Sequence, residues 1–216
     1  MRALAALLAL CPLPAMACET ALLLAIDVSG SIDTGEYHLQ VEGLAQALQD
    51  GQVQEALLKG QVALAVVQWS GFDQQTLVQD WSRMENPQDI ATLIAQVQAL
   101  PRAFDGSQTA VGQAIRFSTA QFDPVSDCQR RVIDISGDGP ENIGHTVTPA
   151  RQEAMAAKVT INAIAIEDAG AQVAITNFYR KWVITPAGFV ITARGLEDYP
   201  RALREKLLRE LEKPAS

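Results

Sequence analysis

The chain has 216 residues, of which 48% are hydrophobic, and its 25 acidic residues outnumber 17 basic ones to give a formal net charge of −8. A surface of this sign disfavours nucleic acid and anionic membranes as partners. A chain of this length and apolar content can bury one substantial core, so we expect a single domain.

The first 17 residues have the features of a secretory signal peptide. Arg2 precedes an Ala/Leu-rich stretch, and Ala15 and Ala17 give a small-residue cleavage pattern. We predict cleavage after Ala17, which leaves one mature domain at 18–216 with 16 basic and 25 acidic residues, a net charge of −9. The apolar stretch is too short for a membrane span, so we expect no membrane insertion and a periplasmic or secreted protein. A lipoprotein signal would also place Cys18 first, but it usually has Leu where this chain has Ala15.

Short apolar runs then alternate with segments of helical periodicity. The predicted strands are residues 21–26, 62–68, 76–81, 132–135, 159–166 and 188–192. The predicted helices are residues 34–49, 87–100, 109–122, 149–157, 172–179 and 196–211. This alternation predicts a three-layer, doubly wound, Rossmann-like α/β fold with a mostly parallel sheet between helices. The connection before 76–81 is too short for a crossover, so this strand should pair antiparallel at an edge.

Three oxygen-bearing side chains, Asp27, Ser29 and Ser31, follow the first predicted strand in the segment D-V-S-G-S. In a doubly wound sheet, ligands bind at the carboxyl ends of the strands. The G-x-G-x-x-G pattern of dinucleotide sites does not occur in this segment. A carboxylate and two hydroxyls are hard oxygen ligands, which suit a cation such as Mg²⁺.

Two further oxygen-bearing side chains are expected at the same carboxyl edge of the sheet. Thr109 lies in G-S-Q-T-A just before a predicted helix, and Asp138 lies in I-S-G-D-G at the end of the fourth strand. Capping of the next helix by Asp27 and Ser29 would leave both unexplained, although an ordinary turn would account for Asp138 alone. The joint occurrence favours a metal site. Because Mg²⁺ rarely receives a complete protein cage, one position can stay open for an outside ligand.

This order of D-x-S-x-S, a loop with Thr and a strand ending in G-D-G resembles the metal-ion-dependent adhesion site (MIDAS) of von Willebrand factor type A (VWA) domains, over essentially the whole mature chain. More narrowly, the segments LAIDVSGSID, VALAVVQWSG, RRVIDISGDG and TINAIAI resemble a bacterial exported family catalogued as domain of unknown function 1194. The resemblance implies a VWA fold.

The same resemblance implies a ligand set for Mg²⁺, or for Mn²⁺ or Ca²⁺. Ser29, Ser31 and Thr109 would offer hydroxyl oxygens, and Asp27 and Asp138 would bind directly or through water. In this family the remaining ligand is typically a Glu or Asp carboxylate of a protein partner. The implied function is therefore an exported, metal-dependent, adhesion-type binding module, which we expect to be monomeric and not an enzyme.

Several polar residues should line the rim of the same site and are candidate partner contacts: Glu141, Asn142, His145, Glu167 and Asp168. Solvated loop residues are the equal alternative, and for His145 a hydrogen-bonding role within the loop is the stronger interpretation. Asp134 stands inside an apolar strand and needs a partner, which the sequence does not identify.

The mature chain keeps two cysteines, Cys18 and Cys128, an even number in an oxidising compartment. Two independent buried thiols are the alternative. In the VWA topology the first and fourth strands are parallel neighbours, and the cysteines stand nine residues before Asp27 and ten before Asp138. The resemblance thus places both at the amino edge of the sheet at similar height, and we predict a disulfide between them.

Two other functions compete. One is metal-assisted phosphatase or ester hydrolase activity with Asp27 as nucleophile, as in haloacid-dehalogenase-like enzymes. Those enzymes have D-x-D-x-T, whereas this chain has Ser29 in place of the second acid, and His38 and His145 offer little for acid–base chemistry. The other is a structural VWA domain with a degenerate site. Loss of phosphatase turnover in Asp27→Asn would support the first, and unchanged partner binding in Asp138→Ala the second.

Overall fold

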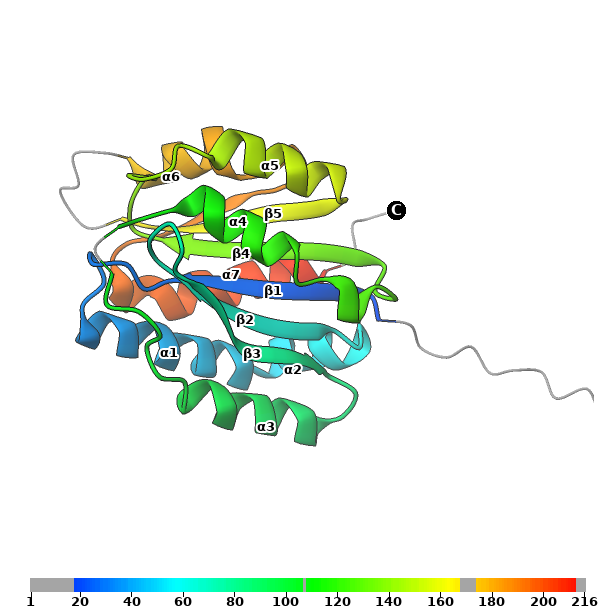
Figure 1. The fold of residues 1–216 in the computed structure, drawn as a ribbon. Coiled ribbons are helices and arrows are strands. Elements are labelled where there is room, and N and C mark those ends of the chain that lie inside the picture. The colour runs from blue at the N-terminus through cyan, green and yellow to red at the C-terminus, as the bar shows by residue number, and fades with distance from the viewer. Residues whose placement is uncertain (1–17, 107, 168–173, 213–216) are drawn as a thin grey trace, which may run out of the picture.

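The computed structural model describes residues 18–106, 108–167 and 174–212, in which a six-stranded sheet lies between two layers of helices (Figure 1). The strands are β1 (Thr20–Asp27), β2 (Ala63–Trp69), β3 (Gln75–Arg83), β4 (Arg130–Gly137), β5 (Val159–Ile166) and β6 (Val190–Ala193). Their order is β3-β2-β1-β4-β5-β6, with β3 antiparallel to β2 and the other neighbours parallel. The predicted fold class and the antiparallel edge strand are confirmed.

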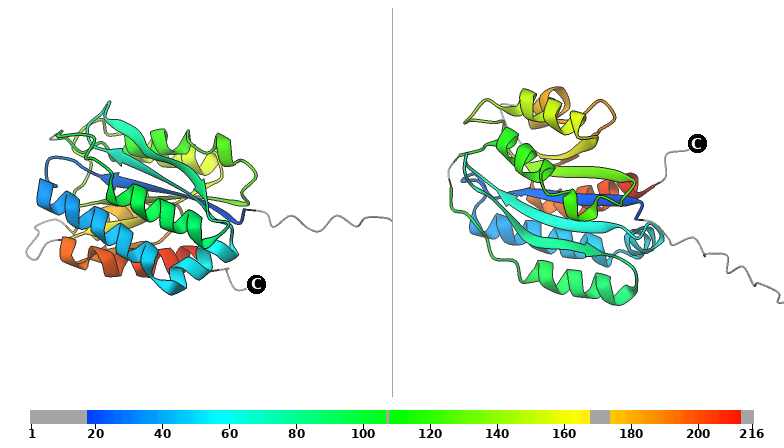
Figure 2. Two further views of the ribbon diagram at one scale, coloured as in Figure 1. Left: turned by 90° about the horizontal axis from the view of Figure 1, so that it is seen from below. Right: turned by 45° about the vertical axis from the view of Figure 1, so that its right-hand side comes forward.

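The helices are α1 (Thr34–Gln49), α2 (Gly51–Lys59), α3 (Pro87–Gln98), α4 (Val111–Thr119), α5 (Val147–Ala156), α6 (Ile175–Phe178) and α7 (Tyr199–Leu211). Helices α1, α2, α3 and α7 cover one face of the sheet, and α4, α5 and α6 cover the other (Figures 1 and 2). Two short 3₁₀ turns, Asp123–Val125 and Leu196–Asp198, and a π turn at Tyr179–Val183 complete the elements of the described chain.

The core is divided by the sheet, and the side-chain alternation of β1 shows why. Leu22, Leu24 and Ile26 belong to the cluster under α1 and α7, whereas Leu23 and Ala25 belong to the cluster under α4 and α5. Every residue of β1 is buried. The uninterrupted apolar run thus reflects a strand covered on both faces, as parallel sheets require.

Helix α2 is an element that the sequence analysis missed. Asp50 ends α1 in an extended conformation and caps α2, since its side chain accepts hydrogen bonds from the backbone N–H groups of Gln52 and Val53. The Asp-Gly pair after residue 49 is a turn signal. An Asp cap followed by Val53 and Leu57 at helical spacing is the sequence pattern that predicts a second helix here.

Three predicted helices begin later than expected. The predicted helix 109–122 begins at Val111, which leaves Thr109 in the preceding loop. The predicted helix 196–211 opens with a 3₁₀ turn, and α7 starts at Tyr199 with Pro200 in its first turn, a position that proline favours. The predicted start at residue 172 lies outside the described residues, and α6 begins at Ile175.

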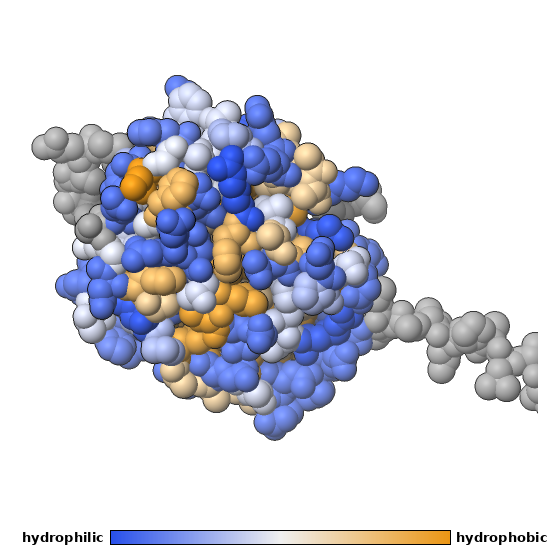
Figure 3. Space-filling model, in the orientation of Figure 1, coloured by the Kyte–Doolittle hydropathy of each residue, from blue (hydrophilic) through white to orange (hydrophobic). Residues whose placement is uncertain are grey.

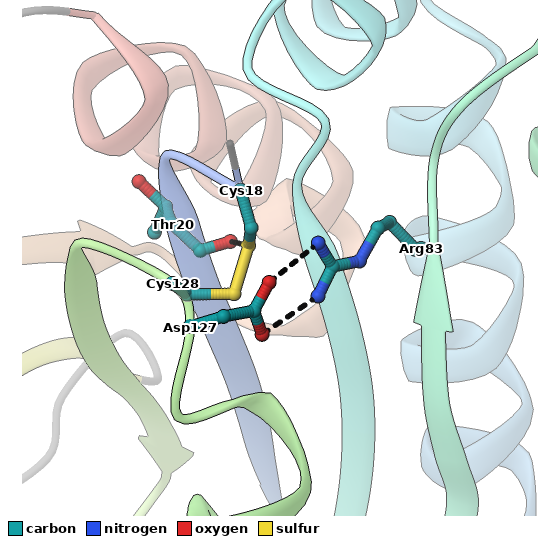
Figure 4. The surroundings of a disulfide bond; sticks show 5 residues. All are labelled: Cys18, Thr20, Arg83, Asp127 and Cys128. Atoms are coloured by element: carbon teal, nitrogen blue, oxygen red, sulfur yellow. Dashed lines mark hydrogen bonds and ion pairs between the residues drawn. A yellow bond between two sulfur atoms is a disulfide. The ribbon is translucent and has the colours of Figure 1, made fainter. Parts of the chain in front are cut away.

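The predicted disulfide between Cys18 and Cys128 is confirmed. It spans 110 residues and joins the segment just before β1 to the loop before β4, with the two Cα atoms 4.5 Å apart (Figure 4). Beside it, Arg83 at the end of β3 makes two hydrogen bonds of 2.9 Å with the Asp127 carboxylate. The amino edge of the sheet is therefore held by one covalent bond and one ion pair.

Hydrophilic side chains cover much of the face seen in Figure 3, and hydrophobic residues gather near its centre. The large hydrophobic side chains with the greatest exposure are Leu39, Phe72, Met155 and Trp182. In the described part of the chain, none of the helices has both the length and the apolar character needed to cross a membrane.

Candidate metal centre

The carboxyl end of β1 holds Asp27 in a fixed and fully buried position. Its Oδ1 accepts a hydrogen bond of 2.7 Å from the backbone N–H of Ser29, and its carbonyl oxygen accepts one of 3.2 Å from Gln40 on α1. The next backbone N–H, that of Val28, donates to Trp69 of β2 at 2.9 Å. The strand pairing thus continues past Asp27 and orients the loop that follows.

A chain of side-chain oxygens runs from this loop to two others. The Ser29 and Ser31 hydroxyl oxygens are 3.3 Å apart, and Ser31 donates a hydrogen bond of 2.7 Å to Oδ1 of Asp138 after β4. The Thr109 hydroxyl lies 3.4 Å from that of Ser29. Ser29 and Thr109 are buried, whereas Ser31 is exposed. The structure therefore brings together all of the oxygen-bearing residues that the D-x-S-x-S, Thr and G-D-G motifs singled out.

Asn142, one of the predicted rim residues, positions Thr109. Its side-chain oxygen accepts a hydrogen bond of 2.9 Å from the Thr109 N–H, and its own N–H donates to the Thr109 carbonyl at 3.0 Å. The N–H of Ala110 also donates to the Ser70 carbonyl after β2 at 2.9 Å. The Thr109 loop is thus tied to the ends of both β2 and β4.

The Glu141 carboxylate is hydrogen-bonded to backbone groups of the same chain. Its carboxylate accepts hydrogen bonds from the backbone N–H groups of Gly112 (2.9 Å) and Thr146 (2.7 Å), at the starts of α4 and α5. Negative charge is stabilised at helix N-termini. A Cβ at Gly112 would collide with Thr146, so the two helix starts approach as closely as a glycine permits. Glu141 therefore holds two helices that flank the site.

The other rim residues lie in different settings. Glu167 follows β5 and accepts a hydrogen bond of 2.6 Å from the N–H of Thr176 in α6. His145 is exposed in a loop with a left-handed backbone, at φ 50°. Asp168 lies outside the described residues. A role for these residues in partner contact stays a prediction.

Burial disfavours the charged form of the Asp27 carboxylate. It raises the pKa of Asp27 to about 7, and repulsion from Asp138 adds to the increase. The second oxygen of Asp27, Oδ2, is buried and makes no hydrogen bond with the described residues. Buried carboxylates need a counter-charge or a coordinated metal.

The oxygen donors of the site fit a hard divalent cation. Within the described ranges no three His, Cys, Asp or Glu side chains are grouped to hold a metal. A site here would instead rely on two carboxylates and three hydroxyls, all of them oxygen donors of the kind that Mg²⁺, Mn²⁺ and Ca²⁺ accept. The unpaired Oδ2 of Asp27 is the observation that agrees with this fit.

Sequence reasoning missed two residues that shape the site, Arg102 and Tyr179. Arg102 donates to the carbonyl oxygens of Val28 and Ser29 at 3.0 and 3.1 Å and so braces the first loop. The hydroxyl of Tyr179 is fully buried, and burial followed by repulsion from Asp27 raises the pKa of this tyrosine well above its usual value. Gly137, which belongs to the predicted G-D-G motif, allows Tyr179 to approach. No local pattern marks Arg102 or Tyr179, because both come from distant parts of the chain.

Gly137 leads to a prediction. A Cβ at this position would collide with the Tyr179 hydroxyl and lie 2.9 Å from Oδ2 of Asp27. Gly137→Ala should therefore lower the free energy of unfolding by about 1–3 kcal/mol, as overpacking does, and weaken binding of Mn²⁺. Gly139→Ala is the matched control, because a Cβ there meets no atom within 4 Å. Denaturant unfolding and metal titration of the two variants check this; equal effects would contradict it.

A family profile described as "Protein of unknown function (DUF1194)" matches residues 17–215. The chain belongs to this family. The predicted family membership is therefore confirmed. A search of curated proteins finds none that matches significantly.

Solved structures with the same fold come from several sources. Proximal thread matrix protein 1 of the mussel byssus has a TM-score of 0.66 and 16% identity, over 89% of this chain and 48% of that one. A structure of it described with a zinc-occupied MIDAS motif has a TM-score of 0.64 and 16% identity, over 91% and 46%. A von Willebrand factor type A protein from Catenulispora acidiphila has a TM-score of 0.65 and 20% identity, over 89% and 43%. The pilus adhesin SpaC from Lactobacillus rhamnosus GG has a TM-score of 0.65 and 12% identity, over 89% and 30%.

At these identities the likeness shows the fold alone, and that fold is VWA-like, as predicted. This chain spans less than half of the length of each of these proteins.

Proposed function

We propose that this domain is an exported, metal-dependent protein-binding module. Asp27, Ser29, Ser31, Thr109 and Asp138 would hold Mg²⁺, or Mn²⁺ or Ca²⁺, and an acidic side chain of a protein partner would complete the coordination. The observation that carries the proposal is the chain of side-chain oxygens from Thr109 through Ser29 and Ser31 to Asp138, which links three loops. The buried Oδ2 of Asp27, at the start of the first of these loops, makes no hydrogen bond with the described residues.

The charge balance supports the same role. A divalent ion would supply positive charge beside Asp27 and Asp138, whose repulsion contributes to the raised pKa of Asp27. Ser31 is exposed, so the outer side of the oxygen chain is open to a macromolecule. A net negative protein offers little long-range attraction to an acidic partner. Local positive charge at the site would therefore have to recruit the partner carboxylate.

The related structures give independent support. One neighbour is described as a pilus adhesin and another as a thread matrix protein with zinc in its MIDAS. The disulfide between Cys18 and Cys128 fits an oxidising compartment outside the cytoplasm. The predicted signal peptide lies outside the described residues, so export remains part of the proposal, as does action as a monomer.

The hydrolase alternative is less well supported. Asp27 has no exposed surface, and its Oδ1 is already engaged by the Ser29 backbone. A nucleophilic carboxylate must reach its substrate. Full burial and the hydrogen bond from the Ser29 N–H suit a ligand or an anchor of the loop, so we propose a binding role without catalysis.

Two buried serines allow a matched test of the proposal. Ser29 lies in the oxygen chain, whereas Ser118 in α4 is equally buried and its hydroxyl makes no hydrogen bond with the described residues. Immobilised wild-type domain should capture a partner from an extract of exported proteins in the presence of Mg²⁺ and release it in EDTA. Ser29→Ala should lower capture at least about tenfold, in the range for damage to a metal site, and Ser118→Ala should leave it unchanged.

The result can contradict the proposal in two ways. Capture that persists in EDTA would remove the role of the metal. Capture that Ser29→Ala and Ser118→Ala affect equally would remove the role of the oxygen chain and favour a structural domain with a degenerate site. Circular dichroism spectra of both variants should match that of the wild type.

A further inference from the structure

A second cluster of charged side chains is buried away from the candidate metal centre, between the sheet and α7. Lys206 has no exposed surface, and its Nζ lies 2.5 Å from Oδ1 of Asp134 on β4 and 2.5 Å from Oε1 of Glu210, one turn further along α7. Asn162 on β5 donates a hydrogen bond of 2.7 Å to the same oxygen of Glu210. This cluster supplies the partner that the sequence could not name for Asp134.

As an ion-pair network the cluster is costly. One ammonium faces two carboxylates, all with 3% exposure or less. Removing such charges from water costs several kcal/mol for each ion, and their mutual attraction often fails to offset that cost. Oδ2 of Asp134 and Oε2 of Glu210 are buried and make no hydrogen bond with the described residues. The arrangement is therefore a weak source of stability. The presence of three charged groups in the core needs another explanation.

The cluster also contains the two functional groups that react in an amide condensation. An amine and a carboxyl group are held in contact, which replaces a bimolecular encounter by an intramolecular one. Burial raises the pKa of Asp134 to about 7, against the attraction of Lys206 and with the added repulsion of Glu210. A buried carboxyl group of this kind is more readily protonated, and a protonated carboxyl is the form that an amine can attack.

We propose that Lys206 and Asp134 become joined by an intramolecular amide bond, with Glu210 as the group that carries the proton. Nζ of Lys206 forms a bond to Cγ of Asp134, and the bond from Cγ to one carboxyl oxygen breaks. Glu210 takes a proton from Nζ and passes it to the departing oxygen, which leaves as water. One amine and one carboxylic acid give one amide and one water, so no oxidant, reductant or co-reactant is required.

The surroundings select Asp134 as the acceptor. Both ends of the Asn162 amide are occupied, because its nitrogen donates to Glu210 and its oxygen accepts a hydrogen bond of 3.0 Å from the N–H of Phe189. The Phe189 ring lies 5.5 Å from Nζ of Lys206, and Arg209 stacks on the same ring at 3.9 Å. An aromatic wall of this kind excludes water, which favours neutral reactants and protects an amide from hydrolysis.

The bond would fasten the last helix to the centre of the sheet. Lys206 is on α7 and Asp134 is on β4, the strand whose preceding loop carries Cys128. The amide and the disulfide would then tie α7, β4 and β1 into one covalently closed unit. This inference does not depend on the proposed metal site.

Peptide mapping of the folded wild-type protein tests the proposal without any substitution. Trypsin cuts after Arg131, Arg151, Arg204 and Arg209, and after Lys206 unless its amine is acylated, so the proposed bond would join peptide 132–151 to peptide 205–209. We expect these two peptides to appear joined, with a mass equal to their sum minus one water. Recovery of unlinked 132–151 together with 205–206 and 207–209, the products of cleavage after a free Lys206, would overturn the proposal. A link from 205–209 to the peptide that begins at Glu210, or a loss of ammonia through Asn162, would also overturn it.

A pair of variants tests the role assigned to Glu210. Glu210→Gln keeps the size of the side chain but removes the proton acceptor, so the joined peptide should be lost. Glu205→Gln is the matched control on the same helix, where Glu205 makes a surface ion pair with Arg201 at 2.8 Å, and the joined peptide should persist. Persistence of the joined peptide in a folded Glu210→Gln protein would overturn the role of Glu210.

Discussion

Asp27→Asn should raise the stability of the metal-free protein at pH 8 and abolish the further stabilisation by Mg²⁺. Asn can still accept the hydrogen bond from the Ser29 N–H, but it removes a charge that is fully buried beside Asp138. A pKa raised from 3.8 to about 7 corresponds to a gain of up to about 4 kcal/mol. For the wild type, Mg²⁺ at about 100 times its Kd should add about 2.7 kcal/mol. Urea unfolding in EDTA and in Mg²⁺ measures both effects.

The stability advantage of Asp27→Asn over the metal-free wild type should grow as the pH rises. In the metal-free native state Asp27 binds its proton up to pH of about 7, whereas in the unfolded chain it loses the proton near 3.8. The native state therefore holds more protons in this window, and the wild type loses stability as the pH rises through it. The advantage of Asp27→Asn should be small at pH 4 and reach its full size above pH 7. A wild type that is the more stable of the two in EDTA at pH 8 would contradict this account of the site.

Removal of the disulfide should have an effect of similar size. Replacement of both Cys18 and Cys128 by Ser should lower the free energy of unfolding by about 3–5 kcal/mol, because the bond closes a loop of 110 residues and restricts the unfolded chain. Chemical denaturation of wild type and double variant, both without reductant, measures the difference.

The adjacent ion pair is the control for that experiment. Arg83→Gln removes the two hydrogen bonds to Asp127 in the same loop but keeps the covalent bond. Because the side chains of Arg83 and Asp127 are 29% and 58% exposed, the variant should lose no more than about 1 kcal/mol. A double cysteine variant that loses no more stability than Arg83→Gln would show that the disulfide contributes little.

The order of apolar runs and helical segments was enough to predict the sheet, since strands buried on both faces, such as β1, have sequences that few other elements share. Helix α2 escaped because its signal is a cap, Asp50, between two segments of similar periodicity. The start of α4 escaped because Thr109 is held by Asn142 and not by its own helix. Local propensity cannot predict a boundary that a distant side chain sets.

For the candidate site, the motifs identified the oxygen ligands but not the residues that position them. Arg102 and Tyr179 act through contacts between segments far apart in the chain, and neither belongs to a recognisable spacing. Gly137 belongs to the G-D-G motif, but only the fold shows that Tyr179 approaches it. Asp134 was recognisable as a carboxylate in an apolar strand, yet its partner Lys206 lies on a helix that reads as an ordinary amphipathic surface element. A charged side chain on such a helix is expected to face solvent, and only the packing of α7 against the sheet shows Lys206 to be buried.

Calorimetric titration of the folded wild-type domain with MgCl₂ and MnCl₂, after removal of metals by EDTA and dialysis, tests the central claim most directly. The account predicts one bound ion for each chain, with binding lost in Asp138→Ala and retained in Asp123→Ala, a control in an exposed turn. Absence of heat and of any metal-induced stabilisation for either ion, in a protein whose spectra show it folded, would contradict the claim that these three loops form a metal site.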